Sequence, residues 1–165
     1  METIKRILFV CTGNTCRSPM AEYLLKELIA EKEELKAKNW EVLSAGISAV
    51  KGADANEKAS TVMAELNIDL AEHSSHNIED IELTREDLII TMTRKHSRAL
   101  VLKHPDLADK IFTLKELSEL DAESRDIQDP FGLSEAVYRE TRDEIRDNLK
   151  ALLEKLKNFE LIEED

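Results

Sequence analysis

The feature that most constrains the fold of this chain is the alternation of short apolar runs with longer amphipathic segments. Residues 4–10 (IKRILFV) have the β-branched and aromatic side chains of a buried strand. Ser18 and Pro19 then give the N-cap and first position of a helix that continues through KELIAEKEELKAK. The same patterns predict strands over 40–44, 87–92 and 110–114, and helices over 56–66, 93–103 and from Ser134 onward. Such alternation predicts an α/β fold, a parallel sheet with helices on both faces, in one domain over residues 1–165.

Length and charge limit the classes of protein that fit. A chain of 165 residues buries roughly two-thirds of its extended surface and needs neither disulfide nor metal to hold a core. The net charge of −12 argues against nucleic acid or an anionic membrane as a partner. The apolar run near the N-terminus is too short for a signal peptide or a membrane span. We expect a cytoplasmic monomer.

A second constraint is the segment CTGNTCRS at residues 11–18, here called the cysteine loop, which holds both cysteines of the chain. It lies between the first predicted strand and helix, where parallel sheets bind ligands. The six residues before Arg17 are enough to wrap one tetrahedral anion with inward N–H groups, and the helix dipole lies behind them. Arg17 offers a planar fork to two phosphate oxygens. We predict phosphate contacts from Thr12, Gly13, Asn14, Thr15, Cys16 and Ser18.

Two loop residues suit a tightly curved backbone. Gly13 is expected to relieve its steric crowding, and Asn14 is among the few other residues that tolerate a left-handed conformation.

The same environment is expected to activate the sulfur of Cys11. An ordinary thiol is only ~3% ionised at pH 7. Oriented amides and Arg17 stabilise the thiolate, which is the nucleophilic form. Ser18 can donate a hydrogen bond to it and steady the sulfur as a leaving group. The spacing Cys-x5-Arg therefore predicts a cysteine nucleophile at the floor of an anion site.

The two cysteines also allow other interpretations. They could be purely structural, or Cys11 and Cys16 could form a disulfide, which is most plausible as a reversible oxidised form. A zinc site with His73 and His76 is disfavoured because Arg17 would repel the cation.

The residues closely resemble the low-molecular-weight protein tyrosine phosphatase family. The resemblance rests on VCTGNTCRSPMAE at residues 10–22, on SAG at 44–46 and on the pair Asp129 and Pro130. It implies a four-stranded parallel sheet of order 2-1-3-4 flanked by helices. It also implies roles: Cys11 as nucleophile, Arg17 as phosphate clamp and Asp129 as general acid, with no metal and no organic cofactor. Ser44 and His73, with Asn14, would match the family's polar network that supports the loop.

Within the family, Thr15 and Phe131 resemble the protein arginine phosphatase branch, since tyrosine-specific members typically carry isoleucine in place of Thr15. A hydroxyl there can bond a forked, polar leaving group, whereas an aliphatic side chain packs on an aromatic ring. Phe131 can stack on a guanidinium, and Asp129 can pair with its charge. The hypothesis is a phosphatase that removes phosphate from phosphoarginine in proteins, with phosphotyrosine as the alternative substrate.

Several alternatives belong to other classes. An arsenate reductase on this fold needs further cysteines downstream, and none follows Cys16. A sugar-transport phosphocarrier needs neither Arg17 nor a later acid, and a phosphoprotein-binding module would bind without hydrolysis. Asp121 and Asp126 lie in the same predicted loop as Asp129, but the proline that follows Asp129 and the resemblance both favour Asp129 as the acid. The remaining histidines, 76, 96 and 104, are predicted to be surface or packing residues.

Overall fold

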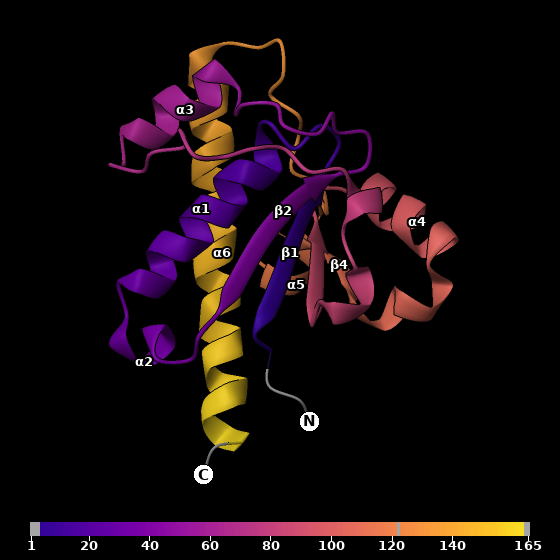
Figure 1. Ribbon diagram of the computed structural model, residues 1–165. Coiled ribbons are helices and arrows are strands. Elements are labelled where there is room, and N and C mark those ends of the chain that lie inside the picture. Colours follow the sequence, from indigo (N-terminus) through magenta and orange to yellow (C-terminus); the bar gives the residue numbers. More distant parts are fainter. Residues whose placement is uncertain (1–3, 122, 164–165) are drawn as a thin grey trace.

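The computed structural model describes residues 4–121 and 123–163 and contains one parallel sheet (Figure 1). Its strand order is β2-β1-β3-β4, and each neighbouring pair is parallel, which confirms the predicted order 2-1-3-4. The strands are β1 (Arg6–Cys11), β2 (Glu41–Gly46), β3 (Leu88–Thr91) and β4 (Ile111–Thr113).

Helices cover both faces of the sheet, as predicted. They are α1 (Arg17–Ala30), α2 (Glu33–Lys36), α3 (Glu57–Ala64), α4 (Arg94–Lys103), α5 (Leu114–Ser118) and α6 (Glu135–Glu163), with 3-10 turns η1 (Ile78–Asp80), η2 (Leu83–Arg85) and η3 (Pro105–Lys110). Among the described residues, none of these helices combines the length and apolar character needed to cross a bilayer.

The buried side chains of β1 alternate between two apolar cores, as the period of a strand requires. Ile7 and Phe9 join the larger core, which α1, α3 and α6 complete. Leu8 and Val10 join the smaller core on the other face, together with Leu100 of α4. Figure 1 shows α1 and α6 on one side of the sheet and α4 on the other. The cysteine loop begins directly at the carboxyl end of β1, a central strand of this sheet.

The first helix differs from the prediction in where it starts and ends. It begins at Arg17 with Cys16 at the N-cap position, so the assignment of Ser18 as N-cap is wrong. The Ser18 hydroxyl contacts the cysteine loop instead of a helix N–H. The predicted continuous helix is also interrupted, because Lys32 is extended, and this turn lets Leu35 of α2 reach the core.

Helix α5 follows β4 directly, where the sequence patterns predicted no helix. Thr113 and Glu116 form a capping box at its start, a local signal that the strand prediction over 110–114 obscured.

Candidate active site

The cysteine loop is held open by hydrogen bonds to its carbonyl groups from outside. The carbonyls of Cys11 and Thr12 accept N–H groups of residues 47 and 48, each at 2.9 Å, and the Thr15 carbonyl accepts one from residue 56 at 2.8 Å. His73 Nε2 binds the Asn14 carbonyl at 2.8 Å. In a planar trans peptide the next N–H points opposite to the carbonyl. The carbonyls of residues 11, 12, 14 and 15 therefore point outward, and the N–H groups of residues 12, 13, 15 and 16 point toward the loop's interior.

Asn14 is the structural centre of the loop. Its φ of 56° is left-handed, as predicted. Its side-chain Nδ2 donates to Ser18 Oγ at 2.8 Å and to Ser44 Oγ at 2.9 Å, and its Oδ1 accepts the N–H of His76 at 2.9 Å. Ser44 and His73, which were predicted to support the loop, thus both contact Asn14. The strained backbone is stabilised by this fully paired, buried amide.

The expectation for Gly13 is wrong, because steric crowding falls on another glycine. A Cβ added at Gly13 would meet only Thr15 Oγ1, at an ordinary 3.7 Å. A Cβ added at Gly46 would lie 2.5 Å from the Thr12 carbonyl oxygen and 2.9 Å from the Asn14 nitrogen. The end of β2 therefore lies directly against the loop backbone, and only glycine fits there.

Both cysteines are buried free thiols, and their surroundings differ. Cys11 Sγ lies 2.8 Å from Ser18 Oγ, the contact expected for a hydroxyl that serves the sulfur. Cys16 Sγ lies 3.3 Å from the hydroxyl of Tyr138 in α6. Burial raises the pKa of Cys16, which opposes its ionisation, and burial likewise raises the pKa of Tyr138. Of the two, Cys11 therefore has the surroundings of the candidate nucleophile.

Arg17 connects the loop to residues 126–131, here called the aspartate segment. Its Nη1 donates to the carbonyl of Ile127 at 2.9 Å, and its Nη2 lies 3.5 Å from Asp129 Oδ2. The guanidinium is buried, whereas Asp129 is half exposed. The Asp129 Oδ1 atom accepts the N–H of Phe131 at 3.1 Å, which orients the carboxylate.

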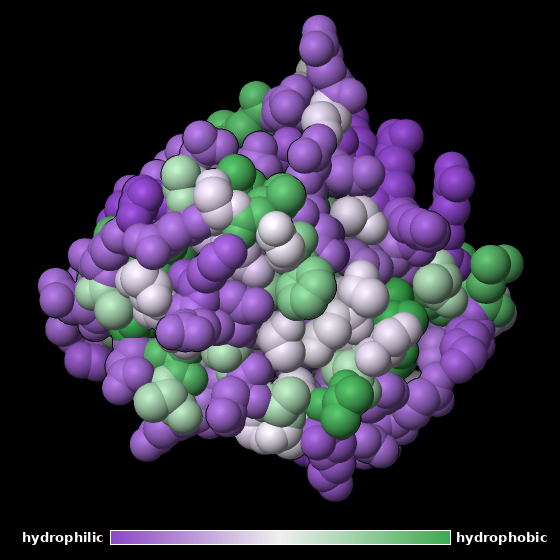
Figure 2. All heavy atoms as spheres, turned by 90° about the horizontal axis from the view of Figure 1, so that it is seen from above, coloured by the Kyte–Doolittle hydropathy of each residue, from purple (hydrophilic) through white to green (hydrophobic). Residues whose placement is uncertain are grey.

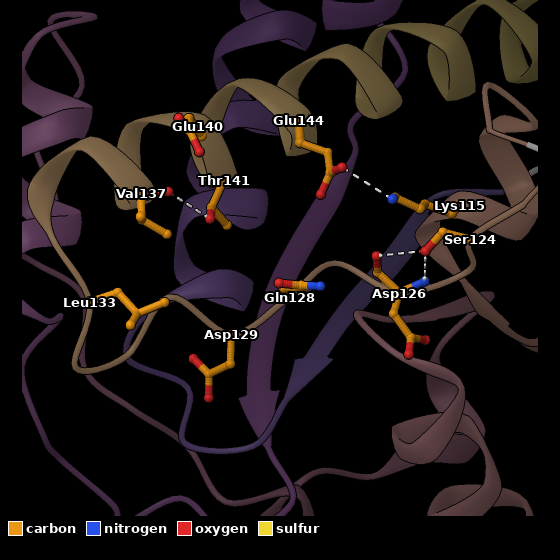
Figure 3. Close-up of a pocket in the computed structure, with 10 residues that line it drawn as sticks. All are labelled: Lys115, Ser124, Asp126, Gln128, Asp129, Leu133, Val137, Glu140, Thr141 and Glu144. Atoms are coloured by element: carbon orange, nitrogen blue, oxygen red, sulfur yellow. Dashed lines mark hydrogen bonds and ion pairs between the residues drawn. The ribbon is translucent and has the colours of Figure 1, made fainter.

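The other two candidate acids lie elsewhere. Asp121 contacts Lys115 at 3.7 Å, and Asp126 Oδ1 accepts the N–H of Arg94 at 2.8 Å. Asp126 lines a neighbouring pocket of about 410 Å³. Figure 3 shows that Asp129 is also among the residues that line it. Only Asp129 of the three lines the pocket that contains Cys11.

That pocket has a volume of about 230 Å³ and opens at the carboxyl end of the sheet. Figure 2 looks onto this end of the molecule and shows weakly polar and apolar side chains gathered within a largely hydrophilic surface. Phe131 is 68% exposed, so its ring is available to a ligand at the pocket's mouth. The residues that line it are Cys11, Thr12, Gly13, Thr15, Cys16, Arg17, Asp129 and Phe131.

Three residues contact the site although the sequence did not assign them to it. Glu22 is buried in α1 and accepts the Ser44 hydroxyl at 2.6 Å; it lies within the matched motif, which could have marked it. Tyr138 carried no sequence signal for its contact with Cys16. His96 was expected to be a surface or packing residue, but its Nε2 lies 2.9 Å from Thr12 Oγ1.

Fold and site together define a class: an α/β protein that brings a thiol, a guanidinium and a carboxylate around one pocket, as cysteine-dependent phosphatases do. The chain belongs to the low molecular weight phosphotyrosine protein phosphatase family, whose model matches residues 6–160.

Relatives of both specificities resemble the chain. It is 42% identical over 151 residues to a protein-arginine-phosphatase of Bacillus subtilis, covering 92% of this chain and 96% of the relative. A solved YwlE arginine phosphatase mutant with a phosphorylated active-site serine is 37% identical, with a TM-score of 0.83 and coverage of 92% and 95%. A low molecular weight protein tyrosine phosphatase from T. tengcongensis is 40% identical, with a TM-score of 0.80 and coverage of 92% and 99%.

Proposed function

We propose that this protein hydrolyses phosphoarginine in proteins through a phosphocysteine intermediate. The observation that carries the proposal is the single pocket that joins Cys11, Arg17 and Asp129 to Thr15 and Phe131. The first three residues supply phosphoryl transfer, and the last two favour a planar, polar leaving group.

In the first step, the Cys11 thiolate attacks phosphorus and the bond from phosphorus to the arginine nitrogen breaks. Arg17 and the N–H groups of the cysteine loop stabilise the charge on the three equatorial oxygens. Asp129, whose carboxylate lies beside Arg17, gives a proton to the departing nitrogen. The products are an unmodified arginine side chain in the substrate protein and a phosphocysteine at Cys11.

In the second step, water attacks the phosphocysteine. Asp129 takes a proton from this water, and the P–S bond breaks to release phosphate and the Cys11 thiolate. The Ser18 hydroxyl, 2.8 Å from the sulfur, stabilises the thiolate as it departs. Support for the covalent intermediate comes from the YwlE mutant, whose active-site serine is phosphorylated.

Specificity for arginine is assigned to Thr15 and Phe131. The Thr15 side chain lines the pocket, where its hydroxyl can accept a guanidinium N–H. The exposed Phe131 ring can stack on the guanidinium plane, and Asp129 can pair with its charge. The identity to a protein-arginine-phosphatase over most of the chain supports this assignment.

Phosphotyrosine is the second candidate substrate, favoured by the similarity to the T. tengcongensis tyrosine phosphatase. The deciding experiment compares kcat/KM for phosphoarginine and phosphotyrosine in peptides of otherwise identical sequence, for the native chain and for Thr15→Ile. We expect the native chain to prefer phosphoarginine and Thr15→Ile to shift the ratio toward phosphotyrosine by at least about tenfold, the scale of one pocket contact. A native preference for phosphotyrosine that Thr15→Ile leaves unchanged rules out the arginine assignment.

We place the reaction in the cytoplasm, because a thiolate nucleophile requires reducing surroundings. That the protein acts as a monomer, and that residues 1–165 form one domain, stay predictions. The net charge of −12 supports a protein substrate in preference to nucleic acid or an anionic membrane.

A further inference from the structure

A buried histidine contacts the cysteine loop from behind. His96 lies in the first turn of α4 and is 7% exposed. Its Nε2 atom is 2.9 Å from Oγ1 of Thr12, the residue that follows the candidate nucleophile. This contact joins a core side chain to a residue at the pocket surface.

The second ring nitrogen determines which atom carries the proton. His96 Nδ1 is buried and has no hydrogen-bond partner among the described residues. Buried N–H groups without an acceptor are rarer than buried acceptors without a donor. We therefore assign the proton to Nε2, which donates to Thr12 Oγ1, and leave Nδ1 unprotonated. Burial, and after it the charge of Arg17, lowers the pKa of His96 to about 4, so the ring is neutral at pH 7.

This arrangement leaves the Thr12 hydroxyl hydrogen available. A hydroxyl has one hydrogen and two lone pairs. One lone pair of Thr12 receives the His96 N–H, and its hydroxyl has no other hydrogen-bond partner in the part of the chain that the structure describes. Thr12 lines the same pocket as Cys11 and Arg17. The free hydrogen can therefore be donated to an oxygen bound there.

The start of α4 is itself fixed relative to the site. Thr93 Oγ1 caps the N–H of His96 at 3.2 Å, and the N–H of Arg94 donates to Asp126 at 2.8 Å. The carbonyl of Met92, just before the helix, accepts the N–H of Ile127 at 2.8 Å. His96 thus belongs to a frame that also holds the aspartate segment, so its ring has a defined position.

We propose that His96 is a positioning residue that holds the Thr12 hydroxyl as a donor to an oxygen of the bound phosphoryl group. Thr12 then adds a side-chain hydrogen bond to the loop N–H groups and the Arg17 fork. The inference rests on the phosphate-binding part of the proposed function and is the same whether the phosphorylated residue is arginine or tyrosine.

The test measures competitive inhibition by inorganic phosphate against p-nitrophenyl phosphate with the full chain. Thr12→Val removes the hydroxyl but keeps the shape, His96→Leu removes the donor, and His96→Gln keeps an amide donor near the Nε2 position. His104→Leu, at the other end of α4, is the control. We expect Thr12→Val and His96→Leu each to weaken phosphate binding about tenfold, the scale of one hydrogen bond to a charged group. His96→Gln should restore most of the affinity, and the control should be unchanged.

The double variant separates positioning from a general structural role. With Thr12 and His96 acting as one unit, Thr12→Val combined with His96→Leu binds phosphate about as weakly as Thr12→Val alone. The inference is overturned if the losses of phosphate affinity in the two single variants multiply in the double variant. It is also overturned if Thr12→Val binds phosphate as tightly as the native chain. This second result decides the question even when His96→Leu fails to fold. A native chain that phosphate does not inhibit would instead contradict the proposed function.

Discussion

The sulfur of Cys11 and the hydroxyl of Ser18 lie 2.8 Å apart at opposite ends of the cysteine loop. The curvature of the loop brings them together, since seven positions separate them in the sequence. Asn14 Nδ2 donates to the same Ser18 oxygen at 2.8 Å. The Ser18 hydrogen is therefore left for the sulfur, and Ser18 is expected to stabilise every state in which that sulfur is negative.

Ser18→Ala should slow release of the intermediate more than its formation. A hydrogen bond to a charged group contributes about 1.5–3 kcal/mol, which corresponds to a fall of about 10- to 100-fold in kcat. Rapid-mixing kinetics with p-nitrophenyl phosphate should show a burst of nitrophenol followed by a slow steady state. Ser48→Ala, an exposed serine beside the loop, is the control. Native kcat without a burst in Ser18→Ala contradicts the assigned role.

Asp129→Asn should lower kcat about 10²–10⁴-fold, because the variant has no acidic proton to give to the leaving group. Asp126→Asn provides the comparison, since Asp126 lies outside the pocket of Cys11 and its bond to the Arg94 N–H survives in an amide. The measurement is kcat against pH for both variants. A larger loss in Asp126→Asn than in Asp129→Asn shows that the acid has been assigned to the wrong residue.

Gly46→Ala should disrupt the site from outside it. The new methyl group would overlap the Thr12 carbonyl and the Asn14 nitrogen, so the loop must shift or the protein must lose about 1–3 kcal/mol of stability. Urea unfolding and phosphate inhibition together measure both effects. Gly13→Ala, whose added methyl group makes only an ordinary contact of 3.7 Å with Thr15 Oγ1, serves as the stability control. If Gly46→Ala matches the native chain in both stability and phosphate affinity, the close approach of Gly46 to the loop backbone does not constrain the site.

His96 should make stability depend on pH between about 6.5 and 4. Its pKa is lowered to about 4 by burial and by Arg17 and Lys95, with Asp126 and Asp129 opposing the shift. The unfolded chain therefore takes up a proton on this histidine as the pH falls below about 6.5, while the folded chain does not until about pH 4. The free energy of unfolding should fall by about 3 kcal/mol over this range from His96 alone. Between pH 7 and pH 4.5, the free energy of unfolding measured with urea should fall less in His96→Gln than in the native chain. An equal fall in the two proteins contradicts the prediction.

Much of the framework could be predicted because its signals are local. The apolar run at residues 4–10 and the Cys-x5-Arg spacing are short-range patterns. A cysteine between a parallel strand and the next helix must lie at the carboxyl end of the sheet, where ligands bind. The left-handed Asn14 was likewise predictable from its own chemistry. The sheet order followed from the resemblance and agrees with the structure.

Contacts between distant segments were decided only by the tertiary structure. Among Asp121, Asp126 and Asp129, the resemblance favoured Asp129, and the structure adds the physical reason, because only this carboxylate of the three lies beside Arg17. The start of α1 at Arg17, the fit of Gly46 against Thr12 and the position of His96 behind the loop also depend on packing. Local pattern fixes which groups can bind an anion, because propensity and spacing act within a few residues. Which distant side chains complete the pocket depends on how the helices pack on the sheet, and no short window of sequence contains that information.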